Sequence, residues 1–80
     1  MYYVYVLRSL KNGRLYTGSS ANVEKRLAEH NAGRTISTRV YRPFELLHKE
    51  TYDNRAAACR RERFLKTGRG RDELRRYLGL

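Results

Sequence analysis

Apolar residues form one continuous run near the N-terminus and recur at helical spacing further along the chain. Tyr2–Leu7 is aromatic, β-branched and uninterrupted, which favours a strand buried on both faces. Lys11-Asn12-Gly13-Arg14 follows this run, and Asn-Gly favours a hairpin because both residues tolerate positive φ. The pattern therefore predicts that Leu15–Gly18 returns antiparallel to the first strand.

A first helix is expected between this hairpin and Gly33. Val23 and Leu27 lie four residues apart and form one apolar stripe, and either Ser20 or Asn22 can cap the helix. Gly33 is suited to end it.

Two residues that could take part in catalysis lie beside that stripe. At about 100° per residue, His30 falls within roughly 20° of Val23, and Arg26 lies roughly 60° away on the same side. Both side chains therefore project from the margin of the packed face, where a half-buried site is expected.

The second half of the chain predicts a loop, a strand and two helices. Arg34–Pro43 has little periodicity and is expected to be a basic loop, and Phe44–Tyr52 is expected to add a third strand. Asp53 or Asn54 can cap a second helix that ends at Thr67-Gly68.

A short last helix is expected to complete the domain. Arg69-Gly70-Arg71 is expected to be a basic link, and Asp72–Leu78 a helix with Leu74, Tyr77 and Leu78 facing inward. The predicted fold is α/β, of the α+β type: a three-stranded antiparallel sheet flanked by helices in the order β-β-α-β-α-α, forming a single domain over residues 1–80.

Glu62 lies in the apolar stripe of the second helix, since Ala58, Glu62 and Leu65 stand at i, i+4 and i+7. Two interpretations remain open. Glu62 can pair with Lys66 on a solvated face, or it can be half-buried and need a partner or a cation to offset its desolvation. A hard divalent cation held by one carboxylate and waters suits phosphodiester chemistry.

Charge is the strongest signal in the composition. The chain carries 18 Lys and Arg against 8 Asp and Glu, a net charge of +10. Such an excess favours a polyanionic partner, most simply nucleic acid, and the alternative is a merely basic surface. No helix pairs a Lys/Arg face with a continuous bulky apolar face, so a membrane partner is not expected.

Several classes of site are absent from the sequence. It contains no Gly-rich phosphate loop, no cysteine cluster and no His-Glu-x-x-His motif. The single Cys59 excludes an intramolecular disulfide. His30 and His48 are too isolated to indicate zinc, so His48 is expected to be an ordinary strand residue.

The N-terminus lacks the features of a signal peptide, which makes the cytoplasm the expected compartment.

The tyrosines and Arg26 offer further chemistry. The hairpin brings Tyr5 and Tyr16 near the start of the first helix, and a Tyr hydroxyl beside a cation can accept a proton or orient a water. Most of the seven tyrosines are expected to be core or interface residues. Arg26 can pair on the surface, or it can place a planar donor fork on a phosphate.

These residues together resemble the GIY-YIG nuclease superfamily, in particular its small stand-alone members related to the incision domain of bacterial excision repair. Tyr3-Val4-Tyr5 and Tyr16-Thr17-Gly18 stand where the two motifs belong, separated by a hairpin. Arg26 and His30 follow in order, and Glu62 comes in the later helix. Tyr3 replaces the first glycine of the motifs and Thr17 the second isoleucine.

The resemblance implies a mechanism. Glu62 and waters would hold one divalent ion, usually Mg²⁺ with Mn²⁺ as the alternative. Tyr5 or Tyr16 would orient the attacking water, and Arg26 with His30 would act on the scissile phosphate or the leaving group.

The leading hypothesis is therefore a metal-dependent endonuclease that hydrolyses phosphodiester bonds of DNA, in repair or recombination. The alternative is a nucleic-acid-binding module with this fold and little or no cleavage, and a structural or protein-partner role comes third. DNA is favoured over RNA, and the chain is expected to be a monomer or a weak homodimer. The basic residues expected to contact nucleic acid are Arg34, Arg39, Arg42, Lys66, Arg69 and Arg71.

Overall fold

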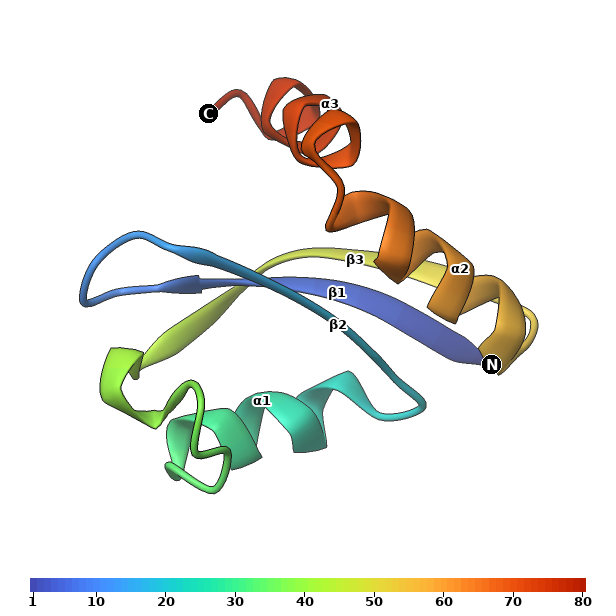
Figure 1. Cartoon of the computed structure of the whole chain (residues 1–80). Helices are drawn as coiled ribbons and strands as arrows, with labels where there is room; N and C mark the ends of the chain where they lie inside the picture. The colour runs from blue at the N-terminus through green and yellow to red at the C-terminus, as the bar shows by residue number, and fades with distance from the viewer.

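The computed structural model describes all residues from Met1 to Leu80 and places one antiparallel sheet between helices (Figure 1). The element order is β1 (Tyr2–Ser9), β2 (Leu15–Ser20), α1 (Val23–Asn31), a short 3₁₀ turn η1 (Arg39–Tyr41), β3 (Phe44–Tyr52), α2 (Arg55–Leu65) and α3 (Gly68–Leu78). The predicted α+β class and the order β-β-α-β-α-α are confirmed.

Strand β1 is central, because the sheet order is β2-β1-β3 and both pairings are antiparallel. Its residues alternate between two cores, as period-2 geometry requires. Val4 and Val6 pack against α2 and α3, whereas Tyr5 and Leu7 pack on the α1 side. Helix α1 accordingly covers one face of the sheet, while α2 and α3 lie on the other (Figure 1).

Asparagine side chains cap the first two helices. The Asn22 side chain accepts a hydrogen bond from the Lys25 amide, and the Asn54 side chain accepts one from the Ala57 amide. These bonds satisfy amides that the first turn of a helix leaves without a partner. Of the two caps left open for each helix, Asn22 and Asn54 are the ones used.

Strand β3 contains a bulge that explains its patchy hydrophobic pattern. Val6 pairs with His48, but Leu7 pairs with Leu46, so Leu47 is the extra residue. An inserted residue of this kind reverses the inward and outward alternation along the strand. The predicted strand Phe44–Tyr52 is nevertheless confirmed at both ends.

The β1–β2 connection is longer than a two-residue hairpin. Only Gly13 adopts a positive φ there, of 77°. The hydrogen bond that closes the turn runs from the Ser9 amide to the Arg14 carbonyl. The predicted hairpin is confirmed, since β2 returns antiparallel to β1, and of the Asn-Gly pair only Gly13 uses the left-handed region. The Asn12 side chain instead accepts a hydrogen bond from the Arg14 amide.

The C-terminal region differs from prediction in two respects. Arg69-Gly70-Arg71 is not a link, because it forms the first turn of α3, which begins at Gly68 with Thr67 as its cap. Gly70 is buried there, and a Cβ at this position would overlap the Phe64 carbonyl of α2. The two helices can approach this closely because Gly70 has no side chain.

Tyr77 does not face inward: its exposed fraction is 76%, whereas that of Leu74 is 4%. Leu74 and Leu78 form the packed stripe one turn apart, and Tyr77 lies at its margin. There the ring meets His48 edge-on, with centroids 5.2 Å apart. No helix in the structure is both long enough and apolar enough to cross a bilayer.

Candidate active site

A cleft of about 340 Å³ gathers all five residues for which the sequence predicts catalytic chemistry, namely Tyr5, Tyr16, Arg26, His30 and Glu62. The other residues that line it come from β2, from the loop after α1 and from the end of α2: Thr17, Gly18, Ser19, Thr35, Ser37, Thr38 and Lys66. Residues from both sides of the sheet therefore meet around strand β2.

Tyr5 reaches the cleft by lying across a glycine. Tyr5 on β1 pairs directly with Gly18 on β2, and a Cβ at Gly18 would overlap the Tyr5 hydroxyl. The ring is 3% exposed, so the core fixes its direction. Gly18 thus supplies the space in which the Tyr5 hydroxyl lies.

His30 is buried, with an exposed fraction of 5%, and both ring nitrogens have partners. Nε2 lies 3.5 Å from the Tyr5 hydroxyl, and Nδ1 lies 2.9 Å from the Thr38 hydroxyl. The Thr38 hydroxyl also lies 3.4 Å from the Thr35 carbonyl, and when it donates its own proton there, its oxygen accepts from Nδ1. This arrangement favours the tautomer with the proton on Nδ1, which leaves a lone pair on Nε2 facing Tyr5.

The charges of His30 and Arg26 are set by their surroundings. Burial and, next, the neighbouring Arg26 charge lower the pKa of His30, which keeps the ring neutral at neutral pH. The Tyr5 hydroxyl beside it and the Glu29 carboxylate, 3.5 Å away, raise the pKa of Arg26. A neutral proton acceptor and a permanent cation therefore lie side by side in the cleft.

Glu62 combines both interpretations that the sequence left open. It pairs with Lys66 through a 2.7 Å bond from the ammonium, and its other oxygen accepts a 2.6 Å bond from the Ser19 hydroxyl. Its side chain is only 21% exposed. Burial alone would raise the pKa of Glu62, but the bonds from Lys66 and Ser19 lower it, so the carboxylate is ionised at neutral pH.

The donor set near Glu62 limits the kind of metal that fits. No group of three or more His, Cys, Asp or Glu side chains is arranged to hold an ion, which does not match a closed zinc or calcium cage. Mg²⁺ keeps several waters and is commonly held by one or two carboxylates plus substrate phosphates. The single ionised carboxylate of Glu62 therefore fits a hydrated hard cation, provided that Lys66 gives up its bond.

Tyr16 forms a wall of the cleft, packed against aromatic neighbours. Its ring meets Phe44 edge-on, with centroids 5.2 Å apart, and lies 6.0 Å from the Tyr41 ring.

His48 lies outside the cleft, where its Nε2 is 2.9 Å from a Glu50 oxygen. Its expected place as a strand residue is confirmed.

The six basic residues expected to contact nucleic acid are spread over several surfaces. Lys66 lines the cleft. Arg71 lines a neighbouring hollow between the start of β2 and the α2–α3 junction, which we call the α2–α3 hollow. Arg34 and Arg69 are exposed and line neither the cleft nor this hollow.

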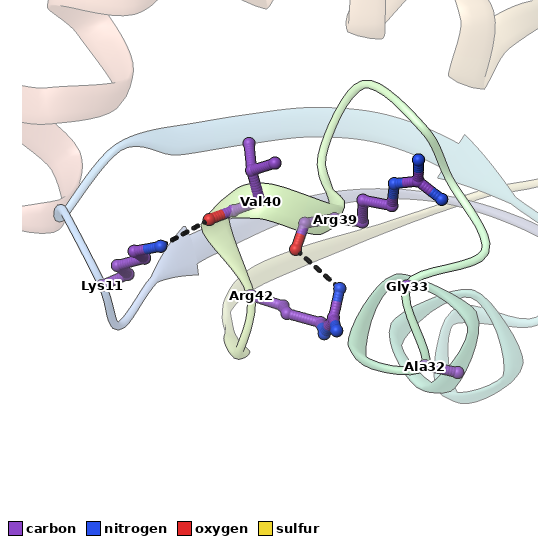
Figure 2. A pocket seen from close by; sticks show the side chains of 6 residues that line it. All are labelled: Lys11, Ala32, Gly33, Arg39, Val40 and Arg42. Carbon is purple, nitrogen blue, oxygen red and sulfur yellow. Dashed lines mark hydrogen bonds between the residues drawn. The ribbon is translucent and has the colours of Figure 1, made fainter.

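Arg39 and Arg42 lie in a separate open hollow of about 650 Å³, together with Lys11 (Figure 2). The Lys11 ammonium donates to the Val40 carbonyl, and the Arg42 guanidinium donates to the Arg39 carbonyl. Figure 2 shows that the Lys11 and Arg42 side chains each reach a backbone carbonyl oxygen. The structure therefore does not bring these two arginines together with the catalytic candidates.

Ser19 and Thr38 contact the site residues directly, and the sequence analysis did not predict either of them. The sequence pattern could have indicated Ser19, because alternation along β2 places it on the face opposite Tyr16 and toward α2. Thr38 had none, since it follows His30 by eight residues in a loop without periodicity, and only the path of that loop brings the two together.

The fold and the cleft define a small α+β domain whose polar site lies beside the edge strand β2 of its sheet. The sequence profile of the GIY-YIG catalytic domain matches residues 1–76. The chain belongs to the GIY-YIG family, a family of nuclease domains.

Similar chains carry the designation UPF0213. A UPF0213 protein of Natronomonas pharaonis is 48% identical over 67 residues, covering 82% of this chain and 78% of that one. One from Staphylococcus haemolyticus is 42% identical, covering 82% of this chain and 80% of that one. The solution NMR structure of the UPF0213 protein BH0048 from Bacillus halodurans has a TM-score of 0.54 and 32% identity, covering 92% of this chain and 82% of that chain.

Proposed function

We propose that this protein is a divalent-metal-dependent endonuclease that hydrolyses phosphodiester bonds of DNA. The observation that carries the proposal is the convergence of Tyr5, Tyr16, Arg26, His30 and Glu62 on one cleft, from elements distant in sequence. The net charge of +10 supports a nucleic-acid substrate. Repair or recombination are the processes that such an enzyme would serve.

Each side chain has a role that follows from its surroundings. The Arg26 guanidinium binds the scissile phosphate and neutralises charge in the transition state. The Tyr5 hydroxyl orients the attacking water and passes a proton to Nε2 of the neutral His30. Glu62 would hold the divalent ion, which would supply Lewis-acid polarisation of the phosphate.

The proton balance of this scheme is complete. The water oxygen forms the new bond to phosphorus as the bond to the leaving oxygen breaks. His30 receives the proton of the water by way of Tyr5, and the leaving oxygen takes a proton from solvent. Because Tyr16 is packed against Phe44 and Tyr41, the proposal assigns the water to Tyr5 and leaves Tyr16 to shape the cleft.

Cleavage assays test this proposal. Single-stranded, branched and duplex DNAs are incubated with wild type and with Arg26→Ala, in Mg²⁺, in Mn²⁺ and in chelator. We expect metal-dependent cleavage by wild type, and a loss on the order of 100-fold in Arg26→Ala, as for removal of one transition-state donor. Cleavage that persists in chelator would contradict the metal role.

A binding module without turnover is the second candidate, and one observation favours it. Both Glu62 oxygens already have partners, Ser19 and Lys66, so a metal must compete for the carboxylate. Salt-sensitive DNA binding without cleavage, and no Mg²⁺-dependent NMR shift at Glu62, would support this candidate over the enzyme.

One cleft per chain cuts one DNA strand at a time, so a monomer or a weak homodimer is compatible with either function.

A further inference from the structure

The cleft continues into the α2–α3 hollow, because the two share Tyr16, Thr17 and Lys66 as lining residues. The hollow has a volume of about 370 Å³, which lies within the range of sites that hold small molecules, about 300–1,000 Å³. A nucleic-acid strand whose phosphate lies in the cleft would therefore have the α2–α3 hollow beside it.

The charges of the hollow suit the backbone of a nucleic acid. Arg14, Arg71 and Arg75 line it, and no carboxylate does. None of these three arginines takes part in an ion pair, unlike Lys66, which is paired with Glu62. Arg71 and Arg75 lie one turn apart on α3, so they project from the same face. Their charge is available to phosphates.

The floor of the hollow is apolar. Leu15, Leu65 and Leu74 form it. Every base has an apolar face, and an unstacked base can lie against aromatic or apolar side chains. In a duplex both faces of a base are covered by its neighbours, so only an unstacked nucleotide can use this floor.

We propose that the α2–α3 hollow is a subsite for one unpaired nucleotide of the substrate strand, next to the phosphodiester in the cleft. Arg71 and Arg75 bind its phosphates, and its base lies on the leucine floor, while the Arg14 guanidinium lies over the Tyr41 ring, 5.5 Å from its centroid. This proposal rests on the proposed nuclease function. It makes the substrate a DNA with a single-stranded segment at the cut site, such as an overhang or a branch.

The test is a binding measurement in chelator, where no cleavage occurs. The probes are a fluorescent thymidine oligonucleotide of roughly 12 nucleotides, within the usual site size of single-strand binders, and a blunt duplex of the same length. The variant is Arg71→Gln/Arg75→Gln. The matched control is Arg60→Gln/Arg76→Gln, which removes the same charge from exposed positions of α2 and α3 that do not line the hollow. Circular dichroism checks that both variants fold.

We expect Arg71→Gln/Arg75→Gln to weaken single-strand binding by about tenfold or more and to lower the salt slope by about two phosphate contacts. Its loss on the duplex should be smaller, and the control should lose less on both probes. Equal losses in the two variants would overturn the subsite, because the arginines would then act only as general surface charge. Equal losses on the two probes would overturn the unpaired nucleotide.

The subsite and the nuclease function fail separately. If the differential binding appears but no DNA is cleaved with any metal, the nuclease function is wrong and the hollow still binds a single strand. If cleavage depends on Glu62 but Arg71→Gln/Arg75→Gln behaves like its control, the subsite is wrong and the nuclease function stands.

Discussion

At the scale of single residues, the cleft depends on partners that fix the protonation of its catalytic candidates. His30 can accept a proton from Tyr5 only if its lone pair is on Nε2, and the Thr38 hydroxyl favours that tautomer by accepting from Nδ1. Thr38 is thus a positioning residue. Because it acts through its bond to His30, its effect should appear in the imidazole itself.

The substitution Thr38→Val tests this role. It keeps the shape of a buried side chain and removes the oxygen that accepts from Nδ1. We expect ¹⁵N NMR to show the Nδ1–H tautomer of His30 in wild type and a mixture in the variant, with cleavage reduced about tenfold. Thr35→Val is the control, because only the backbone carbonyl of Thr35 takes part in this chain of bonds. An Nε2–H tautomer in wild type would rule out the relay.

At the scale of elements, a hydrogen-bonded cluster around Glu50, on the β3 edge of the sheet, joins β3 to α2. Glu50 accepts hydrogen bonds from His48, Tyr52 and Arg61, at 2.9, 2.6 and 3.0 Å. Burial alone would raise the pKa of Glu50, but the bonds from Arg61, Tyr52 and His48 lower it to about 2. The cluster therefore stabilises the fold while Glu50 is ionised.

The pH dependence of this stabilisation has a defined sign. A carboxyl whose pKa falls on folding stabilises the protein above its unfolded pKa, and that contribution is lost as the pH falls from about 4.5 toward about 2. We expect Glu50→Gln to lower the free energy of unfolding by about 2 kcal/mol at pH 7, with a smaller difference at pH 3 in urea titrations. Glu73→Gln, which removes a more exposed partner of Arg61, should cost under about 0.5 kcal/mol. A difference for Glu50→Gln that is the same at both pH values would show that its charge is not involved.

Two glycines in α3 provide a matched pair at the same scale. A Cβ at Gly70 would overlap the Phe64 carbonyl, whereas one at Gly68 meets nothing within 4 Å. We expect Gly70→Ala to destabilise the protein by about 1–3 kcal/mol, because backbone must move. Gly68→Ala should be neutral or stabilising by a few tenths of a kcal/mol. Thermal unfolding compares the two, and equal midpoints would contradict the close contact of α2 and α3.

At the scale of the whole molecule, most of the fold was predictable because it depends on local patterns. The uninterrupted Tyr2–Leu7 run marks the central strand, and asparagine caps mark the starts of α1 and α2. The start of α3 was missed because Gly68-Arg69-Gly70 has low helix propensity. That turn is helical because Thr67 caps it and because Gly70 packs on α2, a tertiary contact that leaves no periodic trace.

The candidate site was predictable to a similar degree and for a similar reason. The order and spacing of Tyr5, Tyr16, Arg26, His30 and Glu62 follow the family resemblance, and the structure places all five around one cleft. The contacts that set their charge and tautomer cross between elements, as from Ser19 to Glu62 and from Thr38 to His30. Such contacts depend on strand register and loop path, which no single segment encodes.

The central claim is that Glu62 makes this cleft a metal-dependent enzyme, and one comparison tests it most directly. Glu62→Gln keeps the shape of the side chain and an oxygen that can accept from Ser19, but it removes the charge that binds the ion. Glu24→Gln makes the same change on an exposed carboxylate of α1, whose side chain is 81% exposed. Single-turnover cleavage of branched DNA in Mg²⁺ should fall on the order of 100-fold or more in Glu62→Gln and stay unchanged in Glu24→Gln. Equal rates for wild type and Glu62→Gln would contradict the account.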